Sequence, residues 1–119
     1  MNTPALSGPS RPVGVRPLRQ TNSFFRGVID NFRTDCRRII TDLGQAARAG
    51  DAQAFDTGLQ ALRDSTANFG AGRLRELTQA MRDPTPAVLR QQGADYVQRL
   101  DAELRRLDIM LVERLRASN

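Results

Sequence analysis

The sequence feature that most constrains the fold is a long apolar stripe that begins shortly after Asn22. Its members recur at steps of three and four residues, which is the spacing of one face of an α-helix. They are Phe24, Phe25, Val28, Ile29, Phe32, Cys36, Ile39, Ile40, Leu43 and Ala47. Asn22 or Ser23 is placed to cap the start of this helix, and Gly50 is placed to end it. The pattern therefore predicts one helix of about 27 residues.

Two further helices are expected directly after the first one. Asp51 is placed to cap a helix that Asn68 and Gly70 close. A third, short helix is expected over residues 71–82. The positions expected to face inward on these two helices are Phe55, Leu59, Leu62, Thr66 and Phe69, followed by Leu74, Leu77 and Met81.

A fourth helix follows the DPTP turn of residues 83–86. Thr85 is a suitable cap and Pro86 suits the first helical position, so the helix is expected to run from there to about Ala117. Its inward positions are Val88, Leu89, Tyr96, Val97, Leu100, Leu104, Leu107, Leu111 and Leu115. Four amphipathic helices with short connections predict an all-α domain, an antiparallel four-helix bundle over residues 22–119. No segment alternates with period two, so strands are not expected.

Residues 1–21 differ in composition from the rest of the chain. The stretch MNTPALSGPSRPVGVRPLRQ contains four of the six prolines, and Arg11, Arg16 and Arg19 make it basic. Such a composition is poor at forming a helix or burying a core, so we expect a flexible tail or linker. Three origins fit it: a linker from an upstream domain, an artificial end of the chain, or a short export or docking signal. We favour the first.

The charge pattern is dispersed rather than clustered. The net charge is +5, and all 18 basic residues are Arg. Arg residues scattered among carboxylates at helical spacing usually form solvated helix faces, although an acidic partner protein or a nucleic acid is an alternative. A nucleic-acid partner is disfavoured because the sequence has neither a basic stripe nor interleaved stacking aromatics. Membrane insertion is not expected, and the lone Cys36 and the missing signal core are compatible with the cytoplasm.

The residue inventory excludes several kinds of catalysis. The chain has no His, no Lys and one Cys. It therefore lacks an imidazole base, a His or multi-Cys metal site and a Walker-type phosphate loop. The neighbouring carboxylates Asp101, Glu103 and Asp108 are expected on differing helix faces rather than as a catalytic pair. We expect a protein that is not an enzyme and that uses no cofactor or metal.

The stretch QALRDSTANFG, residues 60–70, resembles the phosphorylation motif of the histidine-containing phosphotransfer (HPt) family. The family pattern is roughly His-x-Leu-Lys-Gly-Ser-x-x-x-x-Gly, and the two align without a gap. The residues that support the motif are Leu62, Ser65, Asn68 and Gly70. Arg63 stands where the family usually has Lys. The resemblance extends over Phe24 to Arg82, and it implies a four-helix bundle that docks receiver or kinase domains.

Two departures from the family pattern fall on its functional centre. Gln60 occupies the position of the phosphorylated His, and a carboxamide has no nucleophilic ring nitrogen. Asp64 stands where the family usually has Gly, one helical turn after Gln60. A carboxylate there brings bulk and negative charge towards the aspartates of a receiver, at a cost of about 1 kcal/mol or more.

The docking face that the resemblance implies consists of Asp56, Gln60, Arg63, Asp64 and Ala67. These residues could also be a plain solvated surface opposite the apolar stripe. The leading interpretation is a non-catalytic HPt-like module of a two-component phosphorelay that docks a receiver or kinase domain without carrying phosphate.

Two other possibilities stay open beside this interpretation. One is the phosphotransfer domain of a hybrid sensor kinase in which Gln60 replaces the phosphate-accepting His. The other concerns the oligomeric state: a monomer is expected, but a homodimer is possible because Ile109 and Val112 lie beside the main stripe of the last helix.

Overall fold

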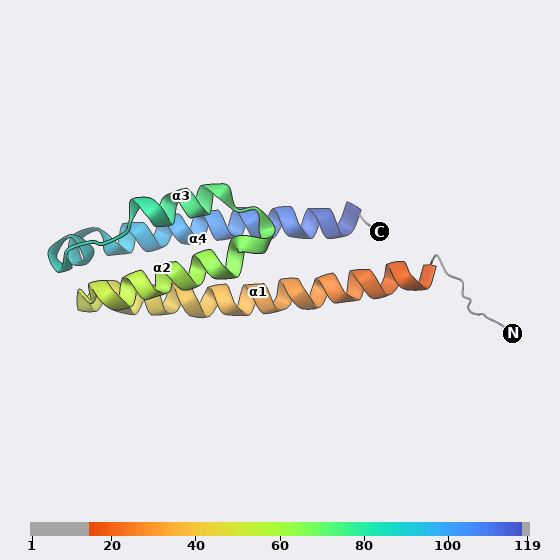
Figure 1. Ribbon diagram of the computed structural model, residues 1–119, viewed down its shortest axis with the longest axis horizontal. Coiled ribbons are helices and arrows are strands. Elements are labelled where there is room, and N and C mark those ends of the chain that lie inside the picture. Colours follow the sequence, from red (N-terminus) through yellow and green to blue (C-terminus); the bar gives the residue numbers. More distant parts are fainter. Residues whose placement is uncertain (1–14, 118–119) are drawn as a thin grey trace, which may run out of the picture.

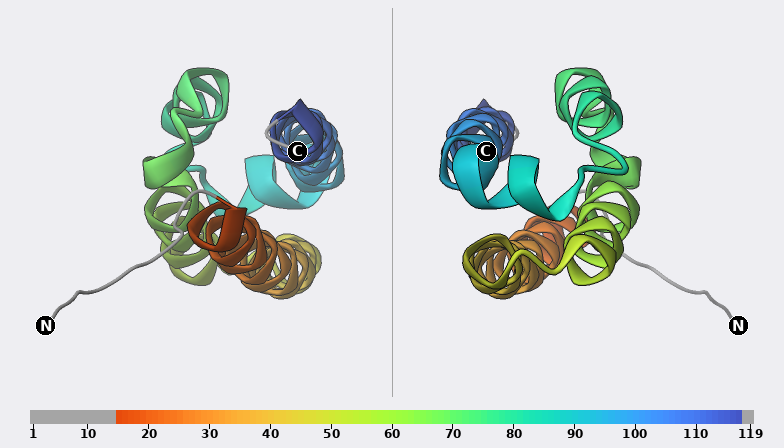
Figure 2. Two further views of the ribbon diagram at one scale, coloured as in Figure 1. Left: turned by 90° about the vertical axis from the view of Figure 1, so that its right-hand side faces the viewer. Right: turned by 90° about the vertical axis from the view of Figure 1, so that its left-hand side faces the viewer.

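The computed structural model describes residues 15–117 of the chain, and this part is a bundle of helices without strands (Figure 1). Its elements are α1 (Val15–Ala49), α2 (Ala52–Thr66), the 3-10 turn η1 (Ala67–Phe69), α3 (Gly72–Ala80) and α4 (Pro86–Ala117). Successive helices run in opposite directions, and α1 packs against both α2 and α4. Viewed along the bundle, the four helices stand at the corners of a quadrilateral (Figure 2). The predicted antiparallel four-helix bundle is confirmed.

Local signals in the sequence set several helix ends. The Asp51 carboxylate accepts a 3.0 Å hydrogen bond from the backbone N–H three residues later, and the Thr85 hydroxyl accepts a corresponding bond of 3.2 Å. Each side chain thereby satisfies a backbone donor that the first helical turn leaves free. Gly50 and Gly70 follow helical segments in the left-handed conformation, with φ of 67° and 65°. The predicted caps and stops at these four residues are confirmed.

Helix α1 begins earlier than the apolar pattern predicts. The predicted start at Asn22 is wrong, because the helix already runs from Val15, through part of the segment expected to be a tail. Pro17 is compatible with this start since it lies in the first turn, where a backbone N–H has no intrahelical partner to lose. Residues 1–14 of the predicted tail lie outside the described residues.

The core runs along the facing stripes of all four helices. The side chains with no exposed surface are Leu43, Phe55, Leu59, Leu62, Thr78, Leu89 and Leu100. The first two members of the α1 stripe depart from this pattern, because Phe24 is 70% exposed and Phe25 is 48% exposed. Within residues 15–117, none of the helices combines the length and the apolar composition needed to cross a membrane.

Candidate docking face on helix α2

Gln60 lies at the centre of a row of hydrogen-bonded side chains on the outer face of α2. Its Oε1 accepts a 2.6 Å hydrogen bond from Nη2 of Arg63, and its Nε2 donates a 3.0 Å hydrogen bond to Oδ1 of Asp64. These contacts follow from helical spacing, since residues three and four positions apart are neighbours on one face. Both polar groups of the carboxamide are therefore occupied within α2.

The opposite side of α2 explains why this face is outward. Leu59 and Leu62 are completely buried, whereas Gln60 and Asp64 are exposed. Burying the two leucines contributes on the order of 2 kcal/mol each, which fixes the rotation of the helix about its axis. The motif position of Gln60 is thus held at the surface by the packing of its neighbours.

The docking face borders a hollow between α2 and the start of α3, with a volume of about 430 Å³. We call it the α2–α3 hollow. The residues that line it are Gln60, Arg63, Asp64, Thr66, Ala67, Gly70, Ala71, Gly72 and Arg75. The left-handed Gly70 reverses the chain after η1 and so brings the first turn of α3 beside the end of α2.

Arg75 was not among the residues predicted for the docking face. It is exposed on α3 and lies at the same hollow as Gln60 and Arg63. Nothing in the helical spacing of α2 indicates Arg75, because the contact depends on the chain reversal at Gly70. The sequence signals that could indicate Arg75 are Gly70, which permits the chain reversal, and the short connection from Gly70 to the third helix.

Arg63 retains hydrogen-bonding capacity in this arrangement. Its side chain is partly buried, and Nη2 is used by Gln60. Among the residues that the structure describes, Nη1 of Arg63 is a buried nitrogen with no hydrogen-bond partner. A buried guanidinium N–H without an acceptor is unfavourable by about 1–3 kcal/mol.

Asp56 has a different local role from the rest of the predicted face. Its Oδ1 accepts a 3.1 Å hydrogen bond from the backbone N–H of Asp83, in the connection between α3 and α4. Asp83 has a φ of 53°, which is uncommon for a residue other than glycine. Asp56 therefore fastens a strained turn at the far end of α2. Ala67 and Asn68 are exposed near the hollow, and Ser65 is partly buried.

The chemical groups elsewhere in the described residues do not form a second reactive site. Burial raises the pKa of the Cys36 thiol to about 11, and the nearby Asp35 and Asp108 carboxylates add to the effect, so the thiol stays protonated at neutral pH. Residues 15–117 contain no cluster of His, Cys, Asp and Glu suited to a metal ion.

The carboxylates singled out in the sequence each pair with a separate arginine. The pairs are Asp101 with Arg105, Glu103 with Arg73, and Asp108 with Arg33. Because each carboxylate is engaged with a different cation, the three do not form an acid–base pair.

A comparison with protein-family models matches residues 27–117 to the family described as Hpt domain. The match includes the whole of α2, η1, α3 and α4 and the part of α1 from residue 27 onward. Neither the curated proteins nor the solved structures contain a significant match to the chain.

Proposed function

The chain belongs to the Hpt domain family, whose members are phosphotransfer modules of two-component phosphorelays, and from this membership we propose a docking function without phosphate transfer. In this proposal the outer face of α2 binds a receiver domain or a sensor kinase domain. The protein either holds that partner as a scaffold or competes with a module that does carry phosphate.

The observation that carries the proposal is Gln60 at the family's phosphorylation position. An amide nitrogen has its lone pair delocalised into the carbonyl, so it cannot attack an aspartyl phosphate as an imidazole does. The frame around the position is nevertheless retained, since Leu62 is fully buried and Gly70 adopts the left-handed turn. Recognition can persist on such a frame although the transfer step is lost.

The charges around the hollow favour an acidic partner surface. Arg63 and Arg75 line the same hollow as Gln60, and each brings a positive charge to it. A charge-assisted hydrogen bond to a partner carboxylate would be worth about 1.5–3 kcal/mol. Asp64 acts in the opposite direction, because its exposed carboxylate repels an acidic site by about 1 kcal/mol or more unless a cation on the partner compensates.

The direct test is binding of the full chain to a panel of receiver domains and kinase domains, measured by isothermal titration calorimetry. We expect Arg63→Ala to weaken a positive interaction by about tenfold, which corresponds to about 1.4 kcal/mol. Arg99→Ala is the matched control, since it removes the same charge from α4, where Arg99 pairs with Asp95 rather than lining the hollow. Absence of any binding partner in the panel, or equal losses for both variants, would contradict docking at this face.

A second candidate function rests on the same retained frame. The chain is then the phosphotransfer domain of a hybrid sensor kinase in which Gln60 replaces the accepting His. The two candidates differ in whether the chain becomes phosphorylated when His is restored at position 60. Because Gln60 is hydrogen-bonded to Asp64, that substitution has to be tested both with and without the Asp64 carboxylate.

A further inference from the structure

Two of the four helices extend beyond the other two at one end of the bundle (Figure 1). The connection between α2 and α3 closes the bundle there, and the Phe69 ring lies against the Phe32 ring with centroids 4.8 Å apart. Past this layer, α1 and α4 continue with only each other as neighbours among the described helices. We call this region the open end and define it as residues 23–31 of α1 and 108–117 of α4.

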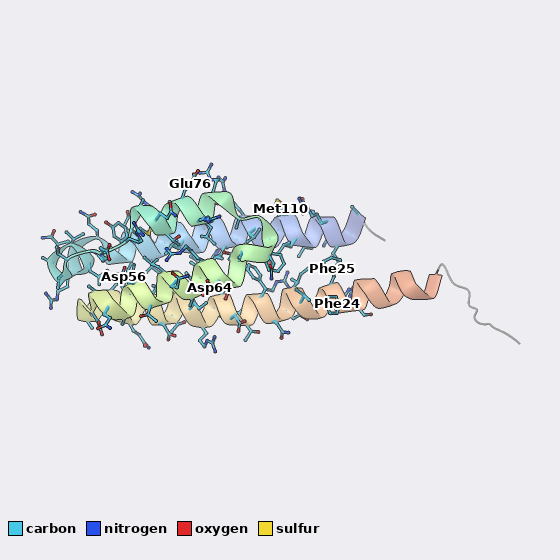
Figure 3. The ribbon with its side chains drawn as sticks, in the orientation of Figure 1. Phe24, Phe25, Asp56, Asp64, Glu76 and Met110 are labelled. Carbon is cyan, nitrogen blue, oxygen red and sulfur yellow. The ribbon has the colours of Figure 1, made fainter. Side chains whose placement is uncertain are left out.

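The open end carries the exposed hydrophobic surface of the described residues. Among residues 23–117, the large apolar side chains that remain exposed are Phe24, Phe25, Ile109 and Met110, with exposed fractions of 70%, 48%, 58% and 38%. Figure 3 shows Phe24 and Phe25 on the part of α1 beyond the α2–α3 connection. Phe25 continues the buried stripe of Ile29 and Phe32 at helical spacing, so the core pattern extends past the point where α2 and α3 cover it.

We infer that a second copy of this chain covers the open end. Elsewhere in the bundle, α2 and α3 complete the packing of α1 and α4. At the open end, α1 and α4 of another copy, related by a twofold axis, can supply the same two missing helices. The result is a symmetric four-helix arrangement in which Phe24 and Phe25 of each copy lie between the two helix pairs.

The charge of residues 23–31 and 108–117 is compatible with a second copy. A twofold interface brings one patch against itself, so a patch of a single sign would repel its own copy. These residues are balanced, although the preceding turns of α1 add Arg16 and Arg19 and the whole chain has a net charge of +5. The three basic residues and three acidic residues of the open end are Arg26, Arg114 and Arg116, and Asp30, Asp108 and Glu113.

The area involved indicates a weak, concentration-dependent dimer. With roughly 200 Å² for each large side chain, the exposed parts of Phe24 and Phe25 amount to about 240 Å² per copy. Partly buried neighbours such as Val28 and Leu115 and a polar border add to this. An interface of this size lies at or below the lower limit of stable specific interfaces, so we expect a transient dimer with a dissociation constant of about 10–100 µM.

The test is sedimentation equilibrium of the full chain over about 1–500 µM, a range that brackets the expected affinity. We expect a monomer–dimer equilibrium for the natural sequence and association at least about tenfold weaker for the double variant Phe24→Ser/Phe25→Ser. Because both rings are exposed, the double variant should keep its circular dichroism spectrum. A natural chain that stays monomeric throughout this range would overturn the inference.

Two further variants test whether the interface lies at the open end and whether a second copy covers it. Ile109→Ser is the matched control, since Ile109 is equally apolar and lies at the same end, but it faces the outer groove that Arg37 and Asp101 also line. Loss of the dimer in this variant together with its retention in the phenylalanine variant would place the interface in that groove and overturn the inference. Deletion of residues 1–14 should leave association unchanged; if only the deleted chain associates, those residues cover the open end instead.

The dimer and the proposed docking function can fail separately. Arg63 and the α2–α3 hollow are not part of the residues that define the open end. The phenylalanine variant should therefore bind a receiver or kinase domain with the affinity per chain of the natural sequence, and Arg63→Ala should leave the dimer unchanged.

Discussion

The carboxylate of Asp64 accepts a 3.0 Å hydrogen bond from the carboxamide nitrogen of Gln60, one helical turn earlier on the exposed face of α2. The two positions proposed to depart from the family's motif at its functional centre are therefore one interacting pair. A histidine at position 60 would meet this carboxylate in place of the small glycine that the family usually has. The effect of a substitution at position 60 or 64 therefore depends on the residue at the other position.

We predict that Gln60→His restores phosphate acceptance only in part. The imidazole supplies the missing nucleophile, but the Asp64 carboxylate repels the incoming aspartyl phosphate by about 1 kcal/mol or more, which is a rate factor of roughly five to ten. Gln60→His/Asp64→Gly should therefore be phosphorylated faster than the single variant. The measurement is the time course of phosphohistidine formed from a phosphorylated receiver, resolved on phosphate-affinity gels.

Gln60→Ala is the control for this experiment and should stay unlabelled. A double variant that is also inert would show that the face has diverged beyond these two positions, which removes the candidate function of a phosphotransfer domain with a replaced His.

The contact between Gly93 and Ala47 predicts a large difference between two helical glycines. A Cβ added at Gly93 would lie 2.5 Å from the Cβ of Ala47, whereas one at Gly27 would meet nothing within 4 Å. Gly93→Ala forces α1 and α4 apart and should lower the free energy of unfolding by about 1–3 kcal/mol, because the short Ala47 side chain cannot move aside. Gly27→Ala should raise it by up to about 1 kcal/mol through helix propensity. Urea denaturation of both variants measures the difference.

The ion pair between Arg33 and Asp108 joins α1 to α4 at the border of the open end. Two N–H groups of the guanidinium meet the two carboxylate oxygens, with Nη2 and Oδ2 3.2 Å apart. The side chains are 39% and 33% exposed, so solvent screening limits their coupling energy to about 0.5–1 kcal/mol. A double-mutant cycle with alanine should measure this value and find it reduced in high salt.

The pair of Arg38 and Asp35 provides the control for that cycle. Its charges are 3.7 Å apart within α1, and its side chains are 70% and 49% exposed. Its coupling energy should be close to zero. A coupling energy equal to or larger than that of Arg33 and Asp108 would show that the bidentate contact between Arg33 and Asp108 does not strengthen their ion pair.

Local chemistry explains which parts of the fold the sequence predicts well. The caps at Asp51 and Thr85 and the stops at Gly50 and Gly70 act on their own backbone neighbours, so sequence spacing is sufficient to find them. The hydrogen bond between Gln60 and Asp64 has the same origin, because it needs only a helix.

The features that the sequence did not reveal depend on contacts between distant segments. Arg75 reaches the hollow through the chain reversal after η1, and Asp56 meets the backbone of Asp83, 27 residues later. Phe25 lies on the apolar stripe, yet its exposure is decided by where α2 and α3 end. The early start of α1 is not predictable from the proline content, because proline is unfavourable in a helix interior but tolerated in the first turn, where Pro17 lies.

The buried Cys36 thiol predicts a loss of stability at alkaline pH. Its pKa is raised from 9.0 to about 11, mainly by burial, so the unfolded chain releases this proton before the folded one does. Stability is therefore unaffected below pH 9 and falls by up to about 1.4 kcal/mol per pH unit between pH 9 and 11. The chain suits this measurement because it has no Lys to titrate in the same range. Urea denaturation at pH 8 and at pH 10.5 should show this slope for the natural chain and a much smaller one for Cys36→Ala. Equal slopes would assign the effect to a group other than the Cys36 thiol.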